Sequence, residues 1–206
     1  MALPEGGIIS IIRDVRADQV IPIVSVLVQN GIAGVEVSLS NEEEGLNCIR
    51  NLRAHFGDSL YLGVGTVIEP RQVELALEAG ARFIITPGWD RELVRLVIGR
   101  GIEVFPGVFT PGDVMQAVQE GVEIMKVFPA GSLGPDYIRS LRGPFPGASF
   151  MAVGGVNLQN INEFYKAGCR FFAIGNDLVP RQATAEQLEA IGARAAAYSQ
   201  SLKETS

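Results

Sequence analysis

Short apolar runs recur along the chain, and each is followed by a segment whose apolar residues are spaced three and four positions apart. Runs of that length are typical of buried strands, whereas three- and four-residue spacing is typical of amphipathic helices. Strands are predicted at residues 8–13, 34–40, 61–67, 83–87, 103–106, 123–128, 149–153 and 170–174. Helices are predicted at about residues 18–30, 42–56, 70–79, 91–98, 111–120, 135–141, 158–167 and 185–203.

Turn and capping residues support this division of the chain into strands and helices. Asp18 is predicted to cap the first helix, acids open the second after Asn41, and Thr110-Pro111 opens the fifth. Glycines that precede successive strands lie about 20 to 26 residues apart, which is the length of a compact strand–helix unit. Eight such units without a linker predict a single domain over residues 1–206, an α/β fold of the (β/α)8 TIM barrel class. A doubly wound open sheet is the alternative, but no Gly-x-Gly-x-x-Gly turn follows the first strand.

The alternation within two strands predicts what faces the barrel interior. In residues 34–40 the odd positions are apolar and suit the helix-facing side, so Glu36 should point inward. In residues 123–128, Met125 and Val127 would pack on helices, which turns Lys126 and Phe128 inward. A carboxylate and an amine are therefore expected inside one barrel.

Lys126 is unusual because lysine is rarely buried without a function or a partner. The chain has three lysines beside fourteen arginines, so arginine carries most of the positive charge. One interpretation is structural: Lys126 reaches water at an edge strand or pairs with a buried acid such as Glu36. The other is catalytic, because a lysine with apolar neighbours such as Phe128 keeps a free amine that can attack a ketone. Glu36 would then move protons.

Composition narrows the possible functions. A net charge of −6 argues against a nucleic-acid partner, which would need a basic surface. No apolar run approaches the roughly 18 residues of a membrane span, and residues 1–7 lack the basic and apolar regions of a signal peptide. A cytoplasmic location is therefore expected.

The cysteines and the histidine of the chain offer little catalytic chemistry besides that of the lysine and the carboxylates. Cys48 and Cys169 are far apart without metal-ligand spacing, and they are predicted to be reduced core thiols. His55, the one histidine of the chain, is predicted to lie in the last turn of a helix, where a cation suits the helix dipole. Neither a multi-histidine metal site nor a histidine-based triad is expected, and no metal or cofactor is predicted.

Six motifs occur in order along the chain: Gly34-Val35-Glu36-Val37-Ser38-Leu39, Gly63-Val64-Gly65-Thr66-Val67, Ile85-Thr86-Pro87-Gly88, Phe105-Pro106-Gly107-Val108, Lys126-Val127-Phe128-Pro129-Ala130 and Val153-Gly154-Gly155-Val156. This ordered set resembles the class I aldolases acting on 2-keto-3-deoxy-6-phosphogluconate or -galactonate. The resemblance implies that Lys126 forms a Schiff base with pyruvate and that Glu36 is the general acid/base. It also implies that Arg13 and Thr66 contact the pyruvate end beside Pro87, that Phe128 belongs to the substrate site, and that the enzyme is a homotrimer without a metal.

The last two strands end where barrels commonly bind phosphate through backbone N–H groups. Gly154, Gly155, Gly175 and Asn176 are the predicted phosphate-binding residues, although the glycines could also serve only as tight turns. Asp177 would add charge of the wrong sign if it faced the site.

Two positions depart from the family pattern. Ser40 stands where gluconate-type members usually carry an arginine, an arrangement that looks more like the galactonate-type enzymes and leaves Arg13 as the candidate for the carboxylate. Asn176 stands where family members commonly carry a serine.

The predicted reaction is cleavage of a 2-keto-3-deoxy-6-phospho sugar acid to pyruvate and glyceraldehyde 3-phosphate. A 4-hydroxy-2-oxoglutarate or unphosphorylated 2-keto-3-deoxy acid aldolase is the nearest alternative. A phosphosugar isomerase or epimerase, a metal-dependent pyruvate aldolase, and a non-catalytic phospholigand-binding protein are further alternatives.

Overall fold

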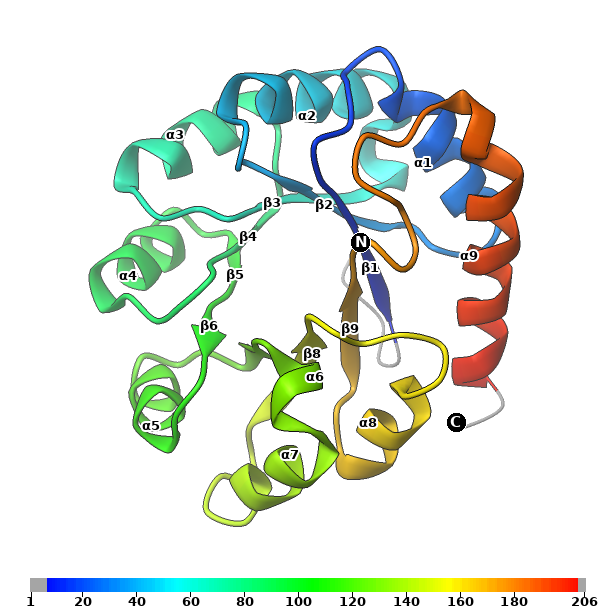
Figure 1. Cartoon of the computed structure of the whole chain (residues 1–206). Helices are drawn as coiled ribbons and strands as arrows, with labels where there is room; N and C mark the ends of the chain where they lie inside the picture. The colour runs from blue at the N-terminus through cyan, green and yellow to red at the C-terminus, as the bar shows by residue number, and fades with distance from the viewer. Residues whose placement is uncertain (1–6, 204–206) are drawn as a thin grey trace.

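Parallel strands form a nearly closed barrel, and helices surround it (Figure 1). The computed structural model describes residues 7–203. Over that range the strands are β1 (Ile8–Ile12), β2 (Gly34–Ser38), β3 (Tyr61–Gly65), β4 (Phe83–Ile85), β5 (Glu103–Phe105), β6 (Gly107–Val108), β7 (Ile124–Val127), β8 (Ser149–Val153) and β9 (Phe171–Ile174). Their order is β5-β4-β3-β2-β1-β9-β8-β7-β6, which confirms the predicted barrel.

The fifth predicted strand, residues 103–106, differs from the prediction because it is split. Phe105 pairs with β4 and Gly107 pairs with Lys126 of β7, so the chain changes partner at Pro106. Proline has no N–H to donate to a sheet, which favours a break at this residue. The Pro106 carbonyl still accepts a hydrogen bond from the Lys126 N–H at 2.9 Å. Thus β5 and β6 occupy one strand position of an eight-position barrel.

The α-helices of the described chain are α1 (Val20–Gln29), α2 (Glu42–Phe56), α3 (Pro70–Ala79), α4 (Arg91–Gly99), α5 (Pro111–Gln119), α6 (Ala130–Leu133), α7 (Pro135–Arg142), α8 (Ile161–Ala167) and α9 (Leu188–Lys203). Short 3-10 helices, η1 (Gly57–Ser59) and η2 (Ala185–Gln187), follow α2 and precede α9. The predicted cap at Thr110 is confirmed, and Asn41, which was predicted to open the second helix with the acids that follow, also caps it. Each side chain accepts a backbone N–H bond.

Two helix predictions were wrong in detail, and one short helix was not predicted. Asp18 does not cap α1, because its carboxylate is paired with Arg16 and Gln19 occupies the capping position without a side-chain bond. The helix α8 begins at Ile161 rather than residue 158, because Asn157 and Asn160 side chains hold the preceding residues in a turn. The short helix α6, directly after the lysine strand, was not predicted.

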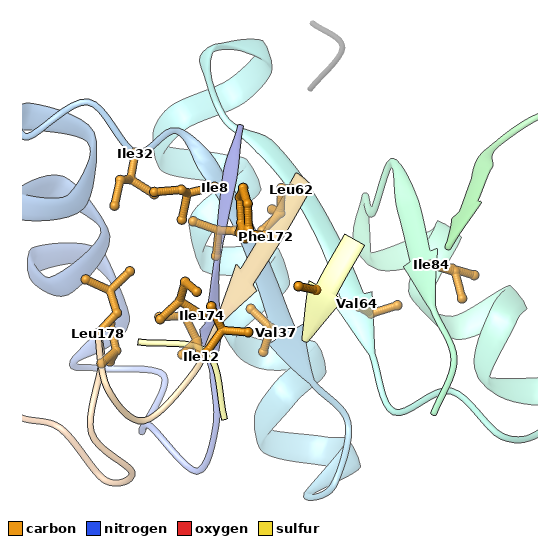
Figure 2. Close-up of a cluster of buried hydrophobic side chains, with 14 of the residues drawn as sticks. Ile8, Ile12, Ile32, Val37, Leu62, Val64, Ile84, Phe172, Ile174 and Leu178 are labelled. Carbon is orange, nitrogen blue, oxygen red and sulfur yellow. The ribbon is translucent and has the colours of Figure 1, made fainter. Parts of the chain in front are cut away.

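The barrel has two apolar layers. The larger lies between the strands and the helices, and Figure 2 shows part of it, including Ile12, Val37, Val64 and Phe172. The smaller fills the interior below the site with side chains that alternate with those of the outer layer: Ile9, Ile11, Tyr61, Phe83, Ile85, Phe105, Met151, Val153, Phe171 and Ala173. This alternation turns the polar positions Glu36 and Lys126 away from the helices.

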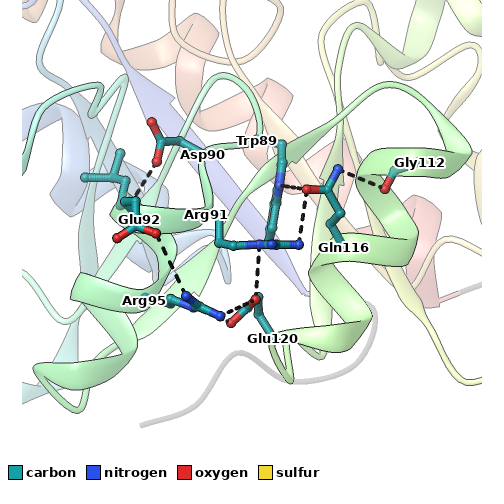
Figure 3. A network of polar contacts seen from close by, with 9 residues as sticks. Trp89, Asp90, Arg91, Glu92, Arg95, Gly112, Gln116 and Glu120 are labelled. Carbon is teal, nitrogen blue, oxygen red and sulfur yellow. Dashed lines mark hydrogen bonds and ion pairs between the residues drawn. The ribbon is translucent and has the colours of Figure 1, made fainter.

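Polar contacts join neighbouring helices on the outer surface. Figure 3 shows Arg91 and Arg95 of α4 paired with Glu120 after α5, with Trp89 donating to Gln116. At the opposite side of the barrel α9 lies beside α1 (Figure 1), and the Ser199 hydroxyl donates to the Asn30 carbonyl at 2.7 Å. The helical shell is thus tied together around the strands.

Several smaller predictions can be compared with the structure. Cys48 and Cys169 are unpaired and buried, and burial raises the pKa of each thiol to about 12. His55 lies in the last turn of α2, as expected. Within residues 7–203 no helix has the length and apolar character needed to cross a membrane. The signal-peptide prediction concerned residues 1–7, of which 1–6 lie outside the described residues.

Candidate active site

A cavity of about 490 Å³ opens where the strands end at their carboxyl termini. It is lined by every residue that the sequence predicted for the site: Arg13, Glu36, Thr66, Pro87, Lys126, Phe128, Gly154, Gly155, Gly175 and Asn176. These residues come from seven different strands or the loops after them. The fold therefore brings all ten predicted positions together, whereas their individual roles stay predictions.

Lys126 lies on β7 and is 7% exposed. Burial lowers the pKa of its amine, and the positive charge of Arg13 lowers it further, whereas Glu36 opposes the shift. The amine nitrogen lies 4.9 Å from the centre of the Phe128 ring. A cavity-facing lysine with a lowered pKa has a larger fraction of free amine at neutral pH than a surface lysine, as a nucleophile requires.

Glu36 lies on β2 and is 2% exposed. Burial raises the pKa of its carboxyl, and the nearby charges of Lys126 and Arg13 oppose that shift. Its Oε2 atom is buried and accepts no hydrogen bond from the described residues, Lys126 included. An acid that is raised in pKa and free of a direct bond is suited to exchanging protons with a substrate or a water molecule.

The backbone of β3 makes room for Glu36. A Cβ atom added to Gly65 would lie 1.6 Å from Glu36 Oε1, and one added to Gly63 would lie 2.3 Å from the Phe83 ring. Both glycines therefore allow side chains of neighbouring strands to cross the interior. The two glycines of the Gly63-Val64-Gly65 motif thus have a physical reason at this site.

Arg13 directly follows β1 and Thr66 directly follows β3, and both line the cavity that holds Glu36 and Lys126. Arg13 Nε is buried and has no hydrogen-bond partner among the described residues. Thr66 has a left-handed backbone with φ of 64°, and its hydroxyl lies 3.0 Å from the Ser38 hydroxyl. A β-branched residue in this conformation is strained, and such strain is commonly found at functional sites. An unpaired guanidinium nitrogen and a fixed hydroxyl that line the same cavity suit a carboxylate.

Pro87 is positioned by the residue before it. The Thr86 hydroxyl donates to the Gly88 carbonyl at 2.7 Å and accepts the Gly107 N–H at 3.2 Å. These bonds bind the loop after β4 to the first residue of β6. Pro87 therefore forms a fixed apolar part of the cavity wall between the two segments.

The glycine pair after β8 turns the chain at the cavity wall. Gly154 and Gly155 have φ values of 82° and 74°, which favour glycine. The Gly154 carbonyl accepts the Gly131 N–H at 2.7 Å, and a Cβ on Gly154 would lie 2.8 Å from the Phe128 ring. The turn therefore packs closely against the segment that follows the lysine strand.

Asp177 was expected to oppose an anion if it faced the cavity. It does line the cavity, but its carboxylate accepts hydrogen bonds from the Tyr198 hydroxyl and the Arg194 guanidinium of α9. Burial and the bond to Asp177 raise the pKa of Tyr198, which keeps this hydroxyl protonated as a donor. The negative charge is thus balanced from outside the cavity.

Sequence reasoning missed Asn157 and Arg181, which also line the cavity. Both lie in loops after the last two barrel strands, so their position at the carboxyl end of the barrel was the available signal. Among the described residues no group of three or more His, Cys, Asp or Glu side chains could hold a metal ion.

Comparison with known proteins identifies the family. The family model for KDPG and KHG aldolases matches residues 1–193. The chain belongs to this aldolase family. It is a class I aldolase, a carbon–carbon lyase, which confirms the prediction made from the ordered motifs.

Two curated relatives have similar lengths. The 2-dehydro-3-deoxy-6-phosphogalactonate aldolase of Escherichia coli K12 is 30% identical over 198 residues, covering 96% of this chain and 95% of its own. The 2-dehydro-3-deoxy-phosphogluconate aldolase of Pseudomonas aeruginosa is 35% identical and covers 78% of this chain and 72% of its own.

Solved structures support the same family. A structure described as native KDPGal is 29% identical, with a TM-score of 0.88, and the match covers all of this chain and 97% of the other. A KDPG aldolase from Legionella pneumophila, solved with pyruvate captured as a covalent carbinolamine, is 27% identical with a TM-score of 0.81, covering 97% of this chain and 93% of that one. These relatives do not favour the isomerase, epimerase or non-catalytic alternatives.

Proposed function

We propose that this aldolase cleaves a 2-keto-3-deoxy-6-phospho sugar acid to pyruvate and glyceraldehyde 3-phosphate through a Schiff base on Lys126. The observation that carries the proposal is the shared cavity of Lys126 and Glu36, whose pKa values burial shifts in opposite directions. Each group is moved toward its neutral form, as a nucleophilic amine and a proton-donating acid require. The named relatives act on substrates of this class.

In the proposed reaction the Lys126 amine adds to the C2 ketone, and loss of water from the carbinolamine gives an iminium ion. Glu36 supplies the proton that leaves with the hydroxyl and then, as a carboxylate, removes the proton of the C4 hydroxyl. The C3–C4 bond breaks, its electron pair moves into the iminium to form an enamine, and the aldehyde departs. Protonation of the enamine at C3 and hydrolysis release pyruvate and regenerate the amine.

The two ends of the cavity differ in chemistry. At the reacting end Arg13 and Thr66 would hold the C1 carboxylate, because the guanidinium Nε is unpaired and the hydroxyl is fixed by Ser38. Pro87 and Phe128 would form the apolar walls beside C3, the methylene carbon of the substrate. At the other end Gly154, Gly155, Gly175 and Asn176 would direct N–H donors toward the phosphate.

Trapping with pyruvate tests the proposal directly. The protein is incubated with saturating pyruvate and reduced with borohydride, and the adduct is located by peptide mass spectrometry. We expect one adduct, on Lys126, in the wild-type protein and none in Lys126→Met. An unmodified wild-type protein, or modification at Lys166 instead, contradicts the Schiff-base proposal.

A panel of substrates tests the specificity. Pyruvate release is measured with the gluconate and galactonate epimers, each with and without the 6-phosphate, and with 4-hydroxy-2-oxoglutarate. We expect the highest kcat/KM for a phosphorylated epimer. The second candidate is 4-hydroxy-2-oxoglutarate cleavage, because the matching family model includes KHG aldolases. A higher kcat/KM for that acid would establish it.

We further propose that residues 1–206 act as one domain and assemble as a homotrimer. Three large apolar side chains around α5, namely Phe109, Met115 and Val118, are exposed in the single chain and support an interface. Light scattering should give three times the chain mass, and a monomer mass would contradict the assembly.

The cytoplasm is the proposed location, because a phosphorylated sugar acid is charged and crosses membranes poorly without a carrier. Cell fractionation measures it: activity in the cytoplasmic fraction is expected, and activity confined to another fraction would contradict the proposal.

A further inference from the structure

We propose that Arg181, in the loop after β9, recognises the phosphoryl group of the substrate and sets the preference for phosphorylated over unphosphorylated acids. The inference rests on the proposed function and extends it to a residue outside the predicted phosphate set. Arg181 lines the same cavity as Lys126, together with Gly154, Gly155 and Asn176.

The distribution of positive charge along the cavity singles out Arg181. Arg13 and Lys126 belong to the reacting end, where each influences the pKa of Glu36. Of the described residues lining the cavity, Arg181 is the remaining cation. A phosphate ester carries close to two negative charges at neutral pH, and a guanidinium can bind its oxygens in a bidentate manner.

Asp177 does not cancel this cation. Its two carboxylate oxygens are occupied by Arg194 and Tyr198 on α9, and the Arg194 Nε also donates to the Asp177 carbonyl. The Asp177 charge is therefore directed toward the helix. Arg181 is left as the charge that an anion at this end of the cavity would meet.

The loop holds Arg181 beside the predicted phosphate residues. The Arg181 N–H donates to Asn176 Oδ1 at 3.2 Å, which folds the loop back on the carboxyl end of β9. Because this oxygen accepts the loop N–H, the Asn176 amide nitrogen is the atom available to donate to a phosphate. The Asn176 side chain and the Arg181 backbone are therefore joined directly, which places the start of the Arg181 side chain beside the predicted phosphate residues.

The guanidinium has one partner among the described residues, and the contact is long and exposed. Its contact with Asp14, from Nη1 to Oδ2, measures 3.4 Å, and the Arg181 side chain is 60% exposed. Exposed ion pairs of this kind contribute little to stability, so a phosphate can replace Asp14 as the partner at small cost. Asp14 lies outside the cavity lining and would hold the arginine near the mouth until the substrate arrives.

The test compares substrates within each protein. For the wild type, Arg181→Ala and Arg181→Lys, kcat/KM is measured for 2-keto-3-deoxy acids with and without the 6-phosphate and for 4-hydroxy-2-oxoglutarate. We expect Arg181→Ala to lower the ratio of phosphorylated to unphosphorylated kcat/KM by on the order of 10-fold or more, mainly through KM, and Arg181→Lys to retain part of it. A ratio within one substrate pair is independent of the fraction of folded enzyme.

Arg16→Ala is the matched control, because it removes one positive charge from an exposed side chain outside the cavity on the same segment as Asp14. It should leave the ratio unchanged. An unchanged ratio in Arg181→Ala, or an effect confined to 4-hydroxy-2-oxoglutarate, overturns the assignment to phosphate. Trapping of pyruvate on wild-type Lys126 tests the Schiff-base proposal separately, since pyruvate carries no distal anion.

Discussion

Gly65 and Glu36 occupy adjoining space on neighbouring strands: a Cβ atom at position 65 would lie 1.6 Å from the Glu36 Oε1 atom. The two residues lie 29 positions apart and are placed together by the parallel register of β2 and β3. The position of the carboxylate in the cavity therefore depends on the absence of a side chain on the next strand.

Gly65→Ala should displace Glu36 and lower kcat by about 100-fold or more, because a displaced carboxyl cannot exchange protons at the reacting atoms. Steady-state pyruvate release measures this loss, and circular dichroism measures whether the barrel is kept. Gly99→Ala is the matched control, since a Cβ there meets nothing within 4 Å. Full activity in Gly65→Ala would show that Glu36 tolerates the displacement or is not the proton carrier.

Removing the buried charges should stabilise the protein while abolishing activity. Lys126 and Glu36 are both buried, and the double variant Lys126→Met/Glu36→Gln replaces the two charges by groups of similar size. We expect its free energy of unfolding at pH 7 to rise by about 1 kcal/mol or more and turnover to vanish. Urea unfolding measures the free energy of unfolding, and pyruvate release measures the turnover. If the double variant has a lower free energy of unfolding than the wild type, burying the two charges does not destabilise the fold.

The pH dependence gives an independent check on Lys126. Its folded pKa is lowered from the ordinary 10.5, so folding disfavours the ammonium form and the cost is fully present below the folded pKa. The cost disappears as the pH rises from the folded pKa toward 10.5. The stability advantage of Lys126→Met, compared within a Glu36→Gln background, should therefore shrink as the pH is raised over that interval. An advantage that is constant with pH would refute burial of the ammonium as its source.

Arg13→Gln should move the pH profile of Schiff-base formation to higher pH. The positive charge of Arg13 lowers the pKa of Lys126, so its removal leaves more of the amine protonated at a given pH. The measurement is the rate of borohydride-trapped pyruvate incorporation against pH, and the KM for substrate should rise in parallel. Arg16→Gln removes an exposed arginine nearby and should leave the profile in place.

Thr66→Gly should raise stability and lower activity. Threonine at φ of 64° is strained, whereas glycine adopts this conformation readily, so the gain in unfolding free energy should be about 1 kcal/mol. The loss of the hydroxyl bonded to Ser38 should weaken binding of the pyruvate end and raise KM. Thermal unfolding and steady-state kinetics give the two results, and Thr66→Ser should restore KM. A lower melting temperature in Thr66→Gly contradicts the strain.

The sequence by itself determined the class of fold, and it predicted that Glu36 and Lys126 face the interior of the barrel. Strict alternation in residues 34–40 assigned Glu36 to the interior, because a strand places successive side chains on opposite faces. In residues 123–128 the expectation that Met125 and Val127 pack on helices assigned Lys126 to the same side. The ordered motifs along the chain then predicted the aldolase family. These conclusions required local periodicity and motif order, both of which a linear sequence contains.

Only the tertiary structure decided the contacts between distant segments. The break at Pro106 depends on which strand each half pairs with, and the balance of the Asp177 charge depends on Tyr198 and Arg194, more than ten residues away on α9. Arg181 likewise gained significance when its loop folded back over the cavity. Local pattern reports the face on which a side chain lies, whereas the partners that change its charge and pKa are set by the packing of the whole barrel.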